Sequence, residues 1–348
     1  MNEKRPRILF IQPNNNYSGS CRVLLTTIKD SYGDFDYKLI TTGTDGILSQ
    51  LPQERIVFIK YPTFNGRIVH GPSYLLYCFK LFFVALCYGF RYRQFYINTI
   101  MPFPAALAGR MIGCKITYHV HEKFINPDIR KRVAAWVMTH IKAKRIYVSN
   151  YLKEAYDDHR SNSEVVYNKL SRDFLQKVNV VPIENRRRDT IVLITAIASK
   201  EKGVDLYFDL AEKCPAYTFW LVTGTPVENA VKFLKGRKLP NFHIFQGGNN
   251  VGRFLQQSDL LLNMSNPFFS QETFGMTILE GMAYGLPAIV PNTGGPKELV
   301  EDGYNGYKVD VTDLNDIKMK LNEILDEKNY VRYCNNSLKM FQKFNSIY

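Results

Sequence analysis

The chain of 348 residues is 45% hydrophobic, so it is long and apolar enough for two domains with cores of their own. Its six cysteines form no C-x-x-C pair, which argues against a zinc site and is typical of free thiols in a reducing cytoplasm. Nearly all of the net charge of +13 falls on residues 1–185, which hold 26 Lys and Arg against 14 Asp and Glu.

A basic charge on one half of a chain indicates an anionic partner for that half. The candidates are a phospholipid surface, a lipid-linked diphosphate and nucleic acid, and a solvated basic surface with no partner stays open. No helix-turn-helix or RNA-binding signature accompanies the charge, so nucleic acid is not expected.

The first half alternates short apolar runs with helical patterns. The run at 7–11 predicts a buried strand and is too short for the core of a signal peptide. A helix at about 21–29 follows. Further strands are predicted near 37–40, 56–59, 95–98, 115–120, 145–148 and 164–167, with helices such as 104–112 and 150–156 between them. This alternation predicts a doubly wound parallel sheet.

The segment 74–90, YLLYCFKLFFVALCYGF, is apolar almost all round. It is near the lower length limit for a membrane span, but Lys80 lies well inside it. We rank a core helix of the first domain first, a helix in contact with a bilayer surface second and a true span third.

A polar, proline-bearing stretch then separates two similar patterns. The predicted domains are 1–182 and 189–327, with a linker at 183–188 and a helix at 328–348. In the second domain we expect strands at 190–196, 217–223, 242–245, 259–263 and 287–290, and a helix at 204–213. Two Rossmann-like domains of this kind would face each other across a ligand cleft.

The most informative segment follows the predicted strand at 259–263. It reads ETFGMTILEGMAYGLP over 272–287, with Glu272 ahead of a helix that opens at Gly275 and Glu280 inside that helix. The free N–H groups of a helix start attract an anion, and flanking carboxylates suit a ligand rich in hydroxyls. A nucleotide-sugar has both properties.

This segment resembles the signature of retaining glycosyltransferases of family 4, also called group 1, which have the GT-B fold. The family pattern is E-x-F-G-x-x-x-x-E-x-M-A-x-G-x-P, and Thr293-Gly294-Gly295-Pro296-Lys297-Glu298 matches the G-G-x-x-E that follows it. The resemblance implies a nucleotide-sugar-binding second domain and an acceptor-side first domain. It also implies that a short end of the C-terminal helix returns to the first domain.

The resemblance also assigns roles to residues of the second domain. Glu280 would bind the ribose hydroxyls, and Glu272 would hold hydroxyls of the donor sugar. Lys202 would neutralise the charge that builds on the departing diphosphate. The start of the helix would contact the diphosphate through Thr273, Phe274, Gly275 and Met276. One departure concerns the phosphate clamp, because Ile197 occupies the usual place of an arginine and Lys200 is the candidate substitute.

In the first domain, the loop containing Gly19 and Ser20 corresponds to a glycine-rich loop that faces the diphosphate and the acceptor. His121 and Glu122 match the family's H-D or H-E, which implies that His121 contacts the donor sugar near the reacting carbon. His119 is expected to be structural. The D-x-D at Asp34 and Asp36 is interpreted as a turn, since no buried strand leads into it.

These observations predict a cytoplasmic enzyme, peripheral to the inner face of a membrane, that transfers a sugar from a nucleotide diphosphate to a hydroxyl acceptor. The reaction would retain configuration and need no metal or other cofactor. The acceptor would be a glycan or a lipid-linked oligosaccharide of surface-polysaccharide assembly. Two alternatives stay open: a nucleotide-sugar 2-epimerase of similar architecture, and a non-catalytic nucleotide-sugar-binding subunit.

Overall fold

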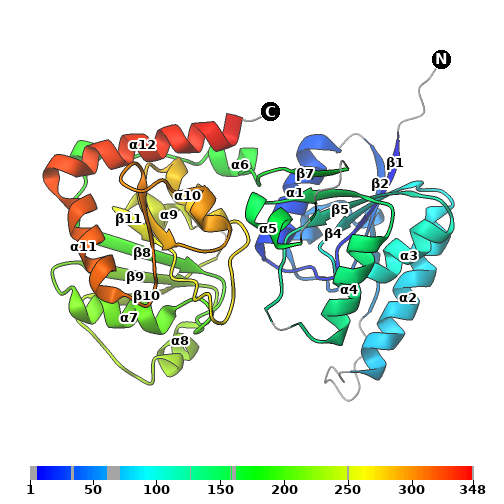
Figure 1. Cartoon of the computed structure of the whole chain (residues 1–348), viewed down its shortest axis with the longest axis horizontal. Coiled ribbons are helices and arrows are strands. Elements are labelled where there is room, and N and C mark those ends of the chain that lie inside the picture. The colour runs from blue at the N-terminus through cyan, green and yellow to red at the C-terminus, as the bar shows by residue number, and fades with distance from the viewer. Residues whose placement is uncertain are drawn as a thin grey trace. The chain divides into compact units, whose positions relative to one another are not determined.

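The computed structural model describes residues 6–32, 35–60, 71–125, 127–156, 158, 162–248 and 251–346. The chain divides into two compact units, Met1–Tyr167 and Asn168–Tyr348. Each unit is built on a parallel sheet with helices packed against it (Figure 1). The predicted fold class, two doubly wound α/β units, is confirmed.

The sheet of the first unit has the strand order β3-β2-β1-β4-β5-β6-β7, and every neighbouring pair is parallel. Its strands are β1 (Arg7–Ile11), β2 (Asp36–Thr41), β3 (Ile56–Phe58), β4 (Gln94–Asn98), β5 (Lys115–Val120), β6 (Lys144–Tyr147) and β7 (Ser163–Val165). The strand order reverses between β1 and β4. In open α/β sheets, ligands bind beyond the carboxyl ends of the strands at such a reversal.

The helices of this unit are α1 (Gly19–Ser31), α2 (Pro72–Gly89), α3 (Phe103–Met111), α4 (Ile129–His140) and α5 (Asn150–Ala155), with short turns η1 (Ile47–Gln50) and η2 (Gln53–Arg55). The connections that contain α2, α3 and α4 each lead toward the β7 edge of the sheet, whereas the connection that contains α1 leads toward the β3 edge. Because parallel crossovers are right-handed, α2, α3 and α4 cover one face and α1 covers the other.

One side of helix α2 is packed on its own unit, whereas Leu75, Phe79 and Phe83 on the other side are exposed, so it is not a wholly buried core helix. A Cβ on Gly89 of α2 or Gly109 of α3 would lie 3.0 Å or less from the ring of Phe95 on β4. The two glycines therefore let both helices close on the strand. Among the described residues, α2 is the one helix long and apolar enough to cross a membrane by length and composition, and 22% of its apolar window is buried.

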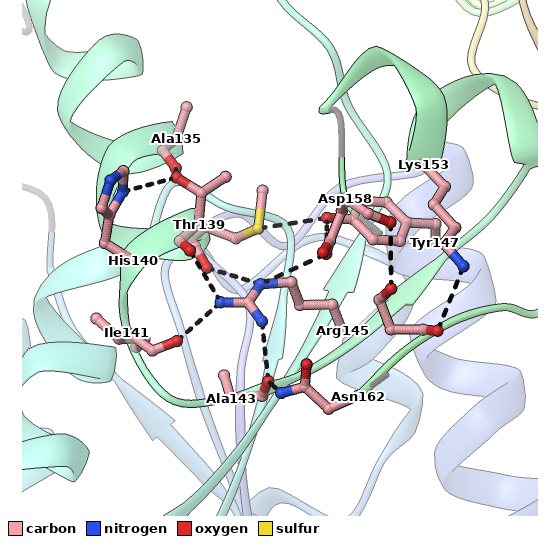
Figure 2. A network of polar contacts seen from close by, with 12 residues as sticks. Ala135, Thr139, His140, Ile141, Ala143, Arg145, Tyr147, Lys153, Asp158 and Asn162 are labelled. Atoms are coloured by element: carbon pink, nitrogen blue, oxygen red, sulfur yellow. Dashed lines mark hydrogen bonds and ion pairs between the residues drawn. The ribbon is translucent and has the colours of Figure 1, made fainter. Parts of the chain in front are cut away.

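A buried guanidinium fixes the end of α4 to β6. Figure 2 shows Arg145 surrounded by carbonyl groups at the carboxyl end of the helix. It donates hydrogen bonds to the carbonyls of Met138, Thr139 and Ile141 at 2.8–3.2 Å, and its Nε lies 3.8 Å from Asp158 Oδ2. Cations stabilise the last turn of a helix because the carbonyls there have no partner within the helix. Helix α4 is not among the helices predicted from the sequence.

The sheet of the second unit has the order β10-β9-β8-β11-β12-β13 and is also parallel. Its strands are β8 (Thr190–Thr195), β9 (Thr218–Thr223), β10 (Phe242–Gln246), β11 (Leu260–Leu262), β12 (Ala288–Pro291) and β13 (Gly306–Val309). Its helices are α6 (Arg172–Leu175), α7 (Val204–Lys213), α8 (Val227–Phe233), α9 (Gly252–Gln256), α10 (Met276–Ala283), α11 (Leu314–Leu325) and α12 (Glu327–Ser346), with η3 (Ile183–Asn185) and η4 (Gly295–Glu298). The reversal lies between β8 and β11, which places the signature segment at the carboxyl edge of this sheet.

The division between the units lies earlier than the linker expected from the sequence. Residues 168–182 group with the second unit, where the ring of Phe174 packs edge-on against Tyr284. Arg186 of the expected linker donates to the carbonyls of Tyr284 and Gly285 at the end of α10. The C-terminal helix α12 packs on α10, α11 and η3 of its own unit, and residues 347–348 lie outside the described residues.

Candidate active site

Two adjacent glycines fix the backbone ahead of α10. The amide of Gly295 donates to the carbonyl of Glu272 at 2.9 Å. A Cβ on Gly295 would lie 2.0 Å from the carbonyl oxygen of Thr273, and one on Gly294 would lie 2.5 Å from that of Glu272. Only glycine permits this approach. The G-G of the sequence pattern therefore holds the backbone of Glu272.

Lys202 reaches Glu272 because its loop is pressed against the end of β11. Gly203 has φ 62°, and a Cβ there would lie 2.0 Å from the carbonyl oxygen of Met264. The amide of Asn266 donates to the carbonyl of Glu201 at 2.9 Å. The two loops are thus joined on either side of Lys202. This explains why the sequence has Lys-Gly at this turn.

The side chains of Lys202 and Glu272 form an ion pair, with Nζ and Oε2 2.7 Å apart. Both are partly buried. The carboxylate of Glu272 raises the pKa of Lys202, against the opposing effect of desolvation. The ammonium is therefore charged throughout the neutral range. The structure brings together two of the residues predicted from the sequence, a fixed cation and an acid, beside the start of a helix.

Helix α10 begins at Met276, with Gly275 as its N-cap at φ 106°. The first turn of a helix has amides without helical partners, and its dipole favours an anion there. The ring of Phe274 is buried, so this residue can face a ligand only through its backbone, while Thr273 and Met276 are partly exposed.

Glu280 lies on α10 and is 5% exposed. An acid kept only for its favourable interaction with the helix dipole would lie at the surface. Burial of a carboxylate is costly, so its retention in the core indicates a specific role. Glu272 is also partly buried. The alternative that both acids are ordinary surface residues is therefore disfavoured.

Ile197, which occupies the usual place of the arginine, and Lys200, its candidate substitute, both lie at the surface. Ile197 is 62% exposed, and Lys200 is exposed in the same loop after β8. The loop is held by the amide of Ala198, which donates to Thr225 Oγ1 at 2.9 Å. Lys200 is thus placed on the loop that carries Lys202, whereas Lys202 alone has the ion pair with Glu272.

In the first unit, a chain of neutral hydrogen bonds crosses the strand ends at the reversal. Asn98 Nδ2 donates to Gln12 Oε1 at 2.6 Å and to the carbonyl of Ser20 at 3.1 Å. Asn98 Oδ1 lies 2.9 Å from His121 Nε2. Because the amide group of Asn98 is used as a donor, its oxygen must accept from the imidazole. His121 therefore carries its proton on Nε2 and presents Nδ1 as an acceptor.

The surroundings of His121 keep its imidazole neutral. Burial, and then the nearby ring of His119, lower the pKa of His121 well below its usual value. His119 is itself buried, which lowers its pKa to about 3, and its Nδ1 lies 2.9 Å from the hydroxyl of Tyr96. His119 is thus held inside the domain, where the sequence suggested a structural role.

The carboxylate of Glu122 caps the backbone beside this cluster. Its oxygens accept from the amides of Ile100 at 2.9 Å and His121 at 3.3 Å. Burial raises the pKa of Glu122 to about 7, against the lowering effect of these amides. Glu122 therefore fixes the turn that carries His121. Gly19 and Ser20 lie in the first turn of α1, and Ser20 is tied to His121 through Asn98.

The D-x-D of the first unit lies away from these strand ends. Asp34 is outside the described residues, and Asp36 starts β2, where it pairs with Arg7, Arg55 and Arg91 at 3.3–3.8 Å. A cavity of about 400 Å³ lies beside it, at the amino edge of the sheet. Within the described ranges, no group of three His, Cys, Asp or Glu is placed to hold a metal ion.

A comparison with protein families matches residues 179–340 to the model described as glycosyl transferases group 1. The part of the chain that carries the candidate site is therefore similar to the group 1 glycosyl transferases. The segment that carries Lys202, Glu272 and Glu280 lies wholly inside this match, which agrees with the resemblance read from the sequence.

Relatives and solved structures extend the likeness over nearly the whole length of the chain. The uncharacterized glycosyltransferase MJ1178 of Methanocaldococcus jannaschii is 26% identical over 258 residues, which are 71% of this chain and 70% of that protein. The N-acetyl-alpha-D-glucosaminyl L-malate synthase of Bacillus anthracis is 32% identical over 108 residues, 31% of this chain and 24% of that protein. Anabaena Alr3699/HepE, solved in complex with UDP, superposes with a TM-score of 0.76 at 19% identity, covering 98% of this chain and 97% of that one.

Two residues of the candidate site were missed from the sequence. Gln12 and Asn98 are buried polar side chains that directly follow or end apolar strands. A polar residue at the carboxyl end of a buried strand was a usable signal. It became informative only once β1 and β4 were known to be neighbours across the reversal.

Proposed function

We propose that this protein is a group 1 glycosyltransferase that moves a sugar from a nucleotide diphosphate to a hydroxyl of a glycan or lipid-linked acceptor, with retention of configuration and without a metal. The observation that carries the proposal is the Lys202–Glu272 pair, 2.7 Å apart beside the opening of α10. One residue of the pair suits the diphosphate and the other suits sugar hydroxyls.

In the proposed reaction, the bond between the anomeric carbon and the diphosphate oxygen breaks, and the electron pair stays on the diphosphate. The charge that develops there is stabilised by the Lys202 ammonium and by the amides at the start of α10. The acceptor oxygen forms the new bond on the same face, and its proton passes to the departing diphosphate. The protein then contributes mainly position and electrostatics.

The roles proposed for the remaining residues come from the resemblance to the family pattern. Glu280 would accept hydrogen bonds from the ribose, and Glu272 would keep hydroxyls of the donor sugar beside Lys202. In the first unit, His121 would contact the donor sugar through its neutral imidazole. A neutral imidazole suits this task, because an imidazolium would have no acceptor.

Uridine nucleotides are the first donors to test. HepE was solved with UDP and with UDP-glucose, and its chain has the same fold as this one. UDP-, GDP- and dTDP-sugars form the panel to be tested, each with and without an extract that contains glycan and lipid-linked acceptors. A cytoplasmic location and a role in surface-polysaccharide assembly complete the proposal.

The test uses Glu280→Gln, with Glu301→Gln as the matched control because Glu301 is exposed in the same unit. We expect the Glu280 variant to bind the active donor at least tenfold more weakly, while the control binds it as the wild type does. Equal affinity of the Glu280 variant and the wild type would refute the ribose assignment. Conversion of the donor without any acceptor would instead indicate an epimerase, and binding without turnover would indicate a non-catalytic subunit.

A further inference from the structure

Helix α2 of the first unit has an apolar side that is exposed among the described residues. Its buried positions recur every four residues, at Ser73, Tyr77, Leu81, Ala85 and Gly89. The opposite side carries Leu75 at 69%, Phe79 at 62% and Phe83 at 45% exposure. A helix on the surface of a globular domain normally places polar residues there.

The neighbouring helices of the same layer continue this surface. Helix α3 lies beside α2, as Figure 1 shows, and exposes Met111. Helix α4 packs on α3 and exposes Ile129 and Trp136, which are far from α2 in sequence but lie in the same layer over the sheet. The guanidinium of Arg130 on α4 lies over the ring of Tyr74 on α2, 5.3 Å from the ring centroid.

We call this surface the α2–α3–α4 face and define it by Leu75, Phe79, Phe83, Met111, Ile129 and Trp136. Ten of the eighteen exposed large hydrophobic residues among those described lie on these three helices or directly after α2. A contiguous exposed apolar surface on a soluble domain marks an interaction site.

The charge of the same region selects the partner. Residues 71–145 hold twelve Lys and Arg against two Asp and Glu, a net charge of +10 out of +13 for the chain. Lys80, Arg110 and Arg132 are exposed on α2, α3 and α4. Of the two acids, Asp128 pairs with Arg130 at 2.7 Å, and Glu122 is bonded to backbone amides.

We propose that the α2–α3–α4 face binds the surface of an anionic phospholipid bilayer, with α2 lying in the plane of the interface. Apolar side chains would enter the headgroup boundary, and the cations would pair with lipid phosphates. A second copy of the chain would bring two faces of the same strong charge together, which disfavours a dimer through this surface. A span is disfavoured because one side of α2 is packed on the domain.

The chain contains a reporter for this proposal. It has two tryptophans, Trp136 on the face, 60% exposed, and Trp220 on β9 of the second unit. In the Trp220→Phe protein, the fluorescence comes from Trp136 alone. We expect a blue shift on addition of vesicles made of equal parts of phosphatidylcholine and phosphatidylglycerol. Pure phosphatidylcholine vesicles and high salt should give little shift.

Two variants separate the apolar and the charged contributions. Leu75→Ser/Phe79→Ser/Phe83→Ser should reduce co-sedimentation with the anionic vesicles by more than tenfold. Arg110→Gln/Arg132→Gln should reduce it by about 25-fold, since each basic residue near an anionic surface contributes roughly fivefold. Met319→Ser and Lys238→Gln, exposed changes in the second unit, are the matched controls and should bind as the wild type does.

The outcome is independent of the donor chemistry, because vesicle binding is measured without any nucleotide. Circular dichroism and thermal unfolding check that each variant is folded. The proposal is overturned if the wild type does not bind anionic vesicles, or if the variants bind as well as the controls. A dimer in solution that the Leu75, Phe79 and Phe83 changes dissociate, with no vesicle binding, would assign the face to a second copy instead.

Discussion

The candidate sites of the two units are held by different kinds of interaction. In the second unit, Lys202 and Glu272 form a charged pair on loops that glycines allow to touch. In the first unit, His121 is tied through Asn98 to Gln12 and Ser20 by neutral hydrogen bonds, in surroundings that disfavour charge on the imidazole.

The difference matches what each group is proposed to do. A partly exposed ion pair can exchange partners with a charged ligand at little cost, because both ions remain hydrated or paired. A buried neutral network instead fixes one tautomer and one orientation. The comparison predicts that the second unit depends on charge and on glycine, whereas the first depends on hydrogen-bond direction.

Lys202→Ala tests whether the second unit depends on charge, and we expect it to have the largest effect. Loss of the cation should lower kcat by about 10²–10³-fold, which corresponds to ~3–4 kcal/mol of transition-state stabilisation. Lys200→Ala is the matched control on the same loop. If the two variants lost activity equally in the donor assay, the second cation of the clamp would be Lys200. If only Lys200→Ala did so, the assignment of Lys202 would be wrong.

Gly295→Ala tests whether glycine is what places Glu272. The new methyl group would meet the backbone at 2.0 Å, so the loop must move. We expect a loss of about 2–4 kcal/mol in the free energy of unfolding, typical of severe backbone clashes, together with weaker donor binding. Gly248→Ala is the control, because a Cβ there has open space. Equal stability of both variants in denaturant titrations would contradict the close approach.

Asn98→Ala tests the direction of hydrogen bonding in the first unit. The substitution removes the hydrogen-bond partner that Gln12 and His121 share, which should lower the free energy of unfolding by about 1–3 kcal/mol. Activity should fall correspondingly, and nitrogen-resolved NMR of the histidines should show loss of the Nε2–H tautomer that we expect in the wild type. A variant with wild-type activity and an unchanged tautomer would show that Asn98 does not orient His121.

Glu122→Gln sharpens the comparison through pH. The folded protein holds a proton on Glu122, with its pKa at about 7, that the unfolded chain releases near its ordinary value of 4.5. Glu122 therefore contributes less stability as the pH rises through this window, by roughly 1.4 kcal/mol per pH unit at most.

The buried histidines act in the opposite sense, because their lowered pKa values cost stability as the pH falls below about 6.5. Removing the Glu122 contribution should therefore make the acid loss of stability between pH 6.5 and 4.5 steeper than in the wild type. Denaturant titrations across this range measure the free energy of unfolding of each variant. Glu154→Gln is the control, because Glu154 is an exposed acid of the same unit and its substitution shows the effect of replacing a carboxylate by an amide. Parallel pH curves for wild type and Glu122→Gln would contradict the raised pKa.

Much of the second unit could be predicted from the sequence because its constraints are local. The spacing of Glu272, Gly275 and Glu280 places an acid, a helix start and a second acid within one short segment, and α10 forms where that spacing requires. The helix at Val204–Lys213 was likewise predicted with its observed ends. The division between the units was less accessible, since Phe174 joins the second unit through its contact with Tyr284, a residue far along the chain.

The sequence by itself determined that the chain forms two parallel α/β sheets. It also predicted which residues of the second unit would bind a nucleotide-sugar, because the strands, glycines and acids there lie within a few residues of one another. Only the tertiary structure decided that Asn98 orients His121 and that the apolar surplus of α2 joins α3 and α4 in one basic face. Both depend on the order of strands in the sheet and the side on which each helix crosses, and these are set by packing between distant segments.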